Sequence, residues 1–234
     1  MAWSYLIGRR RNFHRDALAL VSTIQPPMIV RGTFPPDSDQ GYIVLVNHYW
    51  RPGFRSMWIG ITISSLISSP VRWVMTSAWI YPDFLRSITI TPLSRWFLKK
   101  IAECYGFTLM PPMPPRPEDI QVRAIAVRSL QSYIRSTLRP IIVIAPEGAD
   151  NQSGDLGIPP NGVGRLLYLL LEHGLSLLPC GLYENNGHLH LHIGEPFKPS
   201  IEGIPRQERD QILVSITMRA IAGCLPQHLR GPYA

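Results

Sequence analysis

Two short runs of consecutive apolar residues, many of them β-branched, constrain the fold of this chain more than any other feature. They occupy residues 42–46 (YIVLV) and 141–145 (IIVIA). A strand that is apolar on both faces is covered on both faces, which is typical of a parallel sheet between layers of helices. Segments with helical spacing separate these and further strand-like runs. The alternation predicts an α/β fold, in a single domain with a mixed, mainly parallel sheet flanked by helices.

The remaining elements follow from the same periodicities. We expect further strands at residues 71–75, 107–110, 175–182 and 188–193, the last two joined through Asn185-Asn186-Gly187, and helices at 54–67, 92–104, 120–138, 163–171 and 205–223. The run 111–117 contains five prolines. Proline is excluded from helix interiors and central strands, so this run predicts a stiff surface loop.

The composition of the chain narrows its class. Hydrophobic residues make up 45% of the 234 residues and charged residues 17%, which suits a protein with a sizeable core and excludes a disordered chain. No run of 18 uncharged apolar residues exists, so no membrane-spanning helix is predicted. The three cysteines, Cys104, Cys180 and Cys224, are widely spaced, which favours a reducing compartment over a disulfide framework.

The net charge of +7 suits an anionic partner. Nucleic acid is not favoured, because the basic residues are scattered and no nucleic-acid-binding motif is present. Residues 1–22 combine aromatic side chains, the cluster Arg9-Arg10-Arg11 and the helical spacing of Phe13 and Ala17. This amphipathic segment either lies on an anionic membrane surface or packs on a domain formed by residues 23–234. We expect peripheral association with the cytoplasmic side of a membrane.

Two strand ends carry candidate chemistry, because sites in open α/β sheets lie beyond the carboxyl ends of the strands. His48 follows the first apolar strand, where an imidazole is suited to general-base work. Alternatively, it is a capping or core histidine. Glu147 and Gly148 follow the strand at 141–145 and open a glycine-rich loop. Such a loop either lets backbone amides approach a ligand closely or is a plain surface connection.

Several short blocks follow one another along the chain. They are Asn47-His48, then Pro146-Glu147-Gly148, Ser153-Gly154, Gly162 with Leu166-Leu167, the proline-containing strand at Pro179, and Ile193-Gly194-Glu195-Pro196. Taken in this order, the blocks resemble the glycerolipid acyltransferase family, the 1-acylglycerol-3-phosphate acyltransferases. The resemblance extends from about residue 28 to about residue 200.

The resemblance implies transfer of a fatty acyl group from a thioester, acyl coenzyme A or acyl carrier protein, to a hydroxyl of a lipid or small alcohol. His48 is then the catalytic base. The residues implied in substrate binding are Asn47, Arg51, Arg116, Glu147 and Gly148. The family requires no metal and no bound cofactor.

The sequence also departs from the family pattern. The aspartate expected five residues after the histidine is Gly53, and the threonine and arginine expected after Glu147-Gly148 are Ala149 and Asp150. The arginine block expected near residues 106–111 is missing, and Arg116 does not align with it. Two hypotheses follow. Either the carboxylate comes from elsewhere and the acceptor lacks phosphate, or the chain is a catalytically impaired member that binds a lipid or a partner.

A third hypothesis concerns three histidines at alternate positions of the last strand, His188, His190 and His192. Alternate residues of a strand share one face, so the imidazoles project together. They could ligate zinc. Alternatively, they form a polar face with Leu189, Leu191 and Ile193 turned toward the core.

Overall fold

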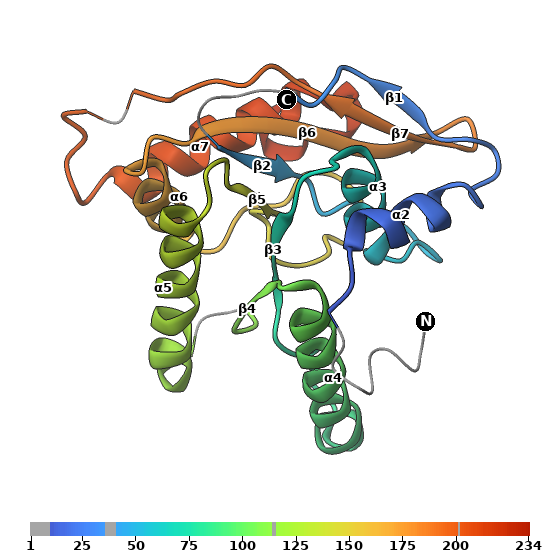
Figure 1. The fold of residues 1–234 in the computed structure, drawn as a ribbon, viewed down its shortest axis with the longest axis horizontal. Coiled ribbons are helices and arrows are strands. Elements are labelled where there is room, and N and C mark those ends of the chain that lie inside the picture. The colour runs from blue at the N-terminus through green and yellow to red at the C-terminus, as the bar shows by residue number, and fades with distance from the viewer. Residues whose placement is uncertain (1–9, 36–40, 114–115, 201) are drawn as a thin grey trace.

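A seven-stranded sheet in the order β1-β7-β6-β2-β5-β3-β4 forms the centre of the computed structural model (Figure 1). The structure describes residues 10–35, 41–113, 116–200 and 202–234. The strands are β1 (Ile29–Arg31), β2 (Tyr42–Val46), β3 (Val71–Thr76), β4 (Thr108–Met110), β5 (Ile141–Ile144), β6 (Ser176–Asn185) and β7 (His188–Ile193).

The sheet is mainly parallel, as predicted. The pairs β6–β2, β2–β5, β5–β3 and β3–β4 are parallel, as is β1–β7. The single antiparallel pair among the described strands is the hairpin β6–β7. Its turn places Asn186 at φ 50° and Gly187 at φ 77°, which is the positive-φ backbone that a two-residue hairpin turn needs.

Helices cover both faces of this sheet. They are α2 (Phe13–Val21), α3 (Met57–Leu66), α4 (Phe84–Tyr105), α5 (Ile120–Ser136), α6 (Val163–Leu171) and α7 (Arg209–Gly223). Alternate residues of β2 separate the two cores: Ile43 and Leu45 pack with side chains of α5, α6 and α7, and Val44 packs with side chains of α3. Every residue of β2 and β5 is buried, which confirms that both strands are covered on both faces.

The structure differs from the predicted elements most clearly in two places. Helix α4 begins at Phe84, eight residues before the predicted start at residue 92, and Pro92 lies inside it. The missed signal is Asp83, whose carboxylate accepts a hydrogen bond from the backbone N–H of Arg86 (2.9 Å) and caps the helix. The short edge strand β1 was not predicted, because three exposed residues show no core pattern.

The N-terminal segment begins outside the described residues, at positions 1–9. Its described part includes α2, which packs against α3 and buries Ala17. Asp16 is also buried, paired with Arg11 and accepting a hydrogen bond from the Tyr105 hydroxyl (2.8 Å). None of the described helices is both long enough and apolar enough to cross a membrane.

Helices α6 and α7 touch at a glycine, which gives a stability prediction. A Cβ atom on Gly164 would lie 2.1 Å from the backbone oxygen of Asp210. Gly164→Ala should therefore lower the free energy of unfolding by about 2 kcal/mol or more, because two backbones would have to separate. Gly223→Ala is the matched control: this glycine, at the end of α7, has no atom within 4 Å of such a Cβ. Equal denaturation midpoints for the two variants would contradict the close contact.

Candidate active site

The two predicted strand ends lie together. Strands β2 and β5 are parallel neighbours, with Leu45 beside Ile144, so the residues that follow them leave at the same edge of the sheet. His48 and Glu147 meet at this edge: the backbone N–H of His48 donates to Oε1 of Glu147 at 2.6 Å. The sequence therefore brings the candidate base and the glycine-rich loop to one place.

Asn47 anchors the end of β2. Its side chain is buried, its amide nitrogen donates to the backbone oxygen of Leu182 (2.8 Å), and its amide oxygen accepts from the Leu182 N–H (2.7 Å). These two bonds tie β2 to β6 where the backbone ladder stops. In this arrangement both ends of the amide are occupied by the protein, and Asn47 positions His48, which follows it.

Glu147 connects the β2 end to the glycine-rich loop. The residue is 6% exposed, and its second carboxylate oxygen accepts a hydrogen bond from the backbone N–H of Gly157 at 2.7 Å. Burial raises the pKa of Glu147, and the two N–H donors oppose that rise because they stabilise the charged form. Glu147 thus holds two loop segments by its two oxygens.

Residues near the C-terminus hold the loop from Gly148 to Gly157 in place. The backbone N–H of Leu156 donates to the oxygen of Leu229 (2.9 Å), and a Cβ on Gly231 would lie 2.2 Å from the oxygen of Leu156. Within the loop, Asn151 donates to the backbone oxygen of Asp155 at 3.0 Å. The C-terminal residues therefore fix the loop that carries the candidate site.

The principal finding at this edge is the position of Asp150. Its carboxylate oxygen Oδ1 lies 2.7 Å from Nδ1 of His48. A carboxylate from the loop after β5 therefore lies beside the imidazole of His48, although position 53 is a glycine. The side chain of His48 is 22% exposed and that of Asp150 is 44% exposed, so the pair lies at the surface of the edge.

The contact is close but not aligned as a hydrogen bond. Nδ1 of His48 is fully covered, yet it makes no hydrogen bond of acceptable angle within the described residues. The two atoms are nevertheless in contact, and a small rotation of the imidazole or of the half-exposed carboxylate would align the pair. Since Nδ1 faces Asp150, Nε2 is the ring nitrogen that remains for proton transfer.

The predicted arginines both have carboxylate partners. Arg51 forms a bidentate ion pair with Glu184 at the end of β6, with one N–O distance of 2.7 Å. Arg116 lies in the proline-rich loop and pairs with Asp119 (3.1 Å) and Glu118 (3.6 Å). Arg51 therefore lies near His48 in the chain and at the sheet edge, whereas the contacts of Arg116 are with its own loop.

The three histidines of β7 share one face, with Leu189, Leu191 and Ile193 buried on the other. His190 stacks on Tyr183, with ring centroids 5.1 Å apart. His188 and His192 lie 3.2 Å from the backbone oxygens of Pro27 and Cys224, respectively. The described part of the chain contains no cluster of three or more side chains placed to hold a metal ion.

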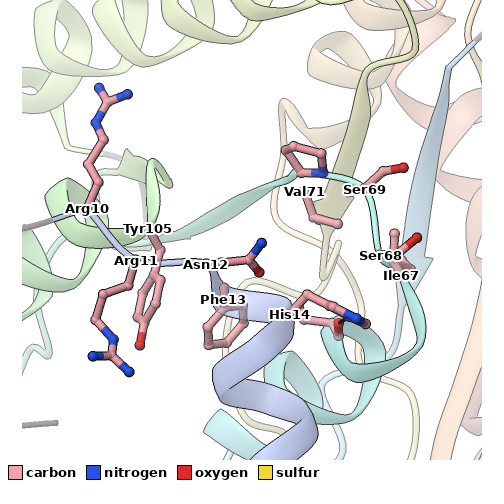
Figure 2. Close-up of a pocket in the computed structure, with 12 residues that line it drawn as sticks. Arg10, Arg11, Asn12, Phe13, His14, Ile67, Ser68, Ser69, Val71 and Tyr105 are labelled. Atoms are coloured by element: carbon pink, nitrogen blue, oxygen red, sulfur yellow. Dashed lines mark hydrogen bonds between the residues drawn. The ribbon is translucent and has the colours of Figure 1, made fainter.

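A cavity of about 280 Å³ lies at the opposite edge of the sheet, where α3 ends and β3 begins (Figure 2). It is lined by Arg10, His14, Ser68 and Tyr105, among others. Nδ1 of His14 lies 2.9 Å from the backbone oxygen of Ser64. Because β2 and β3 are both parallel to β5, this cavity is separated from His48 by the length of the strands.

In the sequence, Asp150 stands only as a departure from the arginine of the family pattern, and its contact with His48 was not predicted. The sequence contained a signal for this contact. Asp150 follows β5 closely, His48 follows β2 directly, and adjacent parallel strands present their ends at one edge. What the sequence could not supply was the strand order, which makes β5 the neighbour of β2.

The bridge formed by Glu147 gives a stability prediction. Glu147→Ala removes the acceptor of two backbone N–H groups and should lower the free energy of unfolding by about 2–4 kcal/mol. Glu147→Gln keeps one acceptor oxygen and should fall between this variant and the wild type. Glu195→Ala, at an exposed site, is the control and should change stability by less than about 0.5 kcal/mol. Chemical denaturation that ranks Glu147→Ala with this control would refute the bridge.

No protein-family model matches the sequence, and no curated protein matches it. The structure is similar to the crystal structure of the 1-acyl-sn-glycerophosphate (LPA) acyltransferase PlsC from Thermotoga maritima. The TM-score is 0.53 and the sequence identity 14%, and the match covers 95% of this chain and 78% of that chain. At this identity the similarity establishes architecture. The chain therefore has the single-domain α/β fold that an acyltransferase uses, in agreement with the fold that the sequence motifs imply.

Proposed function

We propose that this protein transfers a fatty acyl group from a thioester to the hydroxyl of an acceptor without a free phosphate. The observation that carries the proposal is the 2.7 Å contact between Nδ1 of His48 and Oδ1 of Asp150. It supplies the carboxylate that Gly53 lacks. The fold shared with an acyltransferase supports the reaction class, with an acyl thioester as donor and a lipid or small alcohol as acceptor.

In this mechanism Nε2 of His48 takes the proton of the acceptor hydroxyl as its oxygen attacks the thioester carbonyl. Asp150 holds the imidazole by Nδ1 and stabilises the imidazolium that forms. The tetrahedral intermediate then collapses, the carbon–sulfur bond breaks, and the imidazolium returns its proton to the leaving thiolate. The products are an ester and a free thiol, and Asp150 acts as a positioning residue.

The charge around His48 argues for an acceptor that is neutral or zwitterionic. Asp150 and Glu147 both lie against His48, and Glu184 neutralises Arg51. Two unit charges 4 Å apart repel by about 1 kcal/mol even in water, and more strongly in a cleft. A phosphate bound beside His48 would therefore meet carboxylates where the family pattern has an arginine.

We also propose that the protein works at the cytoplasmic side of a membrane as a peripheral protein. The net charge of +7 favours an anionic lipid surface, and fatty acyl acceptors reside in bilayers.

The first activity prediction separates an active enzyme from a lipid-binding member that has lost turnover. His48→Ala should lower acyl transfer by at least about 10²-fold, the contribution of general-base catalysis. Asp150→Asn should lower kcat by about 10²-fold to 10⁴-fold with little change in KM, because it misorients the base without removing a substrate contact. Transfer is measured by mass spectrometry with acyl coenzyme A and a mixture of lipid alcohols.

Two further variants complete this test. Asp150→Glu should retain part of the activity, since it restores a carboxylate near Nδ1, and Glu195→Gln should behave as the wild type. Circular dichroism checks that each variant is folded. Wild-type turnover in folded His48→Ala would overturn the assignment of the base. A wild type with no thioester turnover that binds lipid would favour the impaired alternative.

The second activity prediction concerns the acceptor. Lysophosphatidic acid should bind weakly to the wild type, and the paired change Ala149→Thr with Asp150→Arg should tighten its binding by about tenfold or more, because the local charge reverses. Turnover should be lost in the same variant, since His48 loses its carboxylate. Calorimetry with lysophosphatidic acid below its critical micelle concentration measures the affinity.

Tight binding of lysophosphatidic acid by the wild type, unchanged in the double variant, would contradict the argument from charge. Arg123 would then hold the phosphate. Its Nη2 is buried and has no hydrogen-bond partner within the described residues. Its Nη1 lies 3.6 Å from the sulfur of Met113, and that side chain lies 3.4 Å from the position of a Cβ on Gly148.

A further inference from the structure

We infer that the first half of α4, with the residues that lead into it, is the surface by which this protein docks on an anionic bilayer. The inference deepens the proposed function, because it names the element that would bring the His48 site to lipid substrates. It rests on exposed apolar side chains, on their anchoring to the fold, on their position relative to the site, and on the neighbouring charges.

Large apolar side chains are exposed around most of α4. Phe84 is 75% exposed, Leu85 71% and Leu93 62%. The α4 apolar surface is completed by Trp79, Ile80, Ile88, Ile90, Trp96 and Phe97, each at least 36% exposed. Nine exposed large apolar side chains on one helix and the residues leading into it are unusual on a monomer in water. Such a surface marks a contact with a membrane or another protein.

This surface is held by the fold and is not a loose extension. The backbone N–H of Trp79 donates to the Ser94 hydroxyl (3.0 Å), and its backbone oxygen accepts from the Thr91 hydroxyl (2.9 Å). The rings of Trp79 and Phe97 lie 6.4 Å apart. On the inner side of α4, Leu98 and Ala102 are buried. The apolar residues therefore face outward from a fixed helix.

The α4 apolar surface lies beyond the sheet edge that carries the candidate site. Strand β3 is parallel to β5 and β5 to β2, so residues 77–83 leave β3 at the edge of His48 and Glu147. Helix α4 has 22 residues and is therefore about 33 Å long. Its C-terminal end leads into β4, which pairs with the last half of β3. Its first half consequently extends past the sheet, as the lower end of the molecule in Figure 1 shows.

The distribution of residues along α4 matches the layers of a bilayer surface. Apolar residues dominate its first ten positions, and Arg95, Trp96, Lys99 and Lys100 follow nearer the domain. Apolar side chains among acyl chains, with tryptophan and basic residues at the headgroups, is the order found in interfacial helices. Near the tip, Arg86 is 3.6 Å from Asp83, so this charged pair is neutral as a whole.

Charge also favours a bilayer over a second copy of this chain. Helix α4 with Asp83 contains four basic and two acidic residues, a net charge of +2. Helix α5 extends in the same direction in Figure 1 and has Ile120, Val122 and Ile125 exposed near its start. Two copies meeting at these helices would bring like charges together, whereas anionic headgroups complement them.

The test measures partitioning onto vesicles of phosphatidylcholine and phosphatidylglycerol in a 70:30 ratio. The wild type should bind, and the variant Leu85→Gln with Leu93→Gln should bind at least about tenfold more weakly, because two exposed leucines no longer enter the acyl layer. Leu138→Gln is the matched control. Leu138 is 89% exposed but follows the far end of α5, so its substitution should leave vesicle binding unchanged.

His48→Ala separates docking from chemistry, since it should bind vesicles as the wild type does. Vesicle binding through α4 without thioester turnover would contradict the proposed reaction, and the inference about the docking surface would still hold. Wild-type vesicle affinity in the double leucine variant would overturn the inference and leave the N-terminal arginine-rich segment as the lipid contact. A dimer that forms without vesicles and dissociates in this variant would also overturn it, and sedimentation velocity detects that outcome.

Discussion

The buried carboxylate of Glu147 joins two segments that the sheet alone leaves unconnected. One oxygen accepts the N–H of His48 at the end of β2, and the other accepts the N–H of Gly157 at the far end of the glycine-rich loop. A buried carboxylate is unfavourable without such donors. Burial raises the pKa of Glu147, and the two N–H donors offset only part of that rise. The position of the loop, and of Asp150 on it, depends on this bridge.

In the proposed mechanism, the base and its carboxylate come from the ends of two neighbouring strands and not from one sequence motif. His48 remains at the end of β2, fixed through Asn47, and its carboxylate comes from the loop after β5 in place of position 53. Gly53 has φ 82°, a backbone conformation that favours glycine over aspartate. The backbone at position 53 therefore suits a glycine, and the carboxylate beside His48 comes from Asp150. The linear motif lacks a carboxylate at position 53, whereas the folded chain places one beside His48.

The sequence was sufficient for those parts of the fold that depend on local pattern. The wholly apolar residues 42–46 and 141–145 identified two central strands, and Asn186-Gly187 identified the hairpin. The start of α4 was placed eight residues late, because Pro92 and the exposed apolar residues before it hide the helical period. The role of Asp150 was missed for a different reason. It depends on which strands are neighbours, and strand order is a property of long-range packing that no local period encodes.

The position of Asp150 has a consequence for how this protein can vary. One loop of ten residues, from Gly148 to Gly157, holds the carboxylate that faces the base and also forms the part of the edge where an acceptor headgroup would lie. Under the proposed function, one loop would therefore control both the reaction rate and the acceptor preference. A substitution that adapts the loop to a new headgroup also moves the partner of His48, so a change in selectivity requires a compensating change to restore turnover. Adaptation to new acceptors would proceed by paired substitutions in this loop and not by single ones.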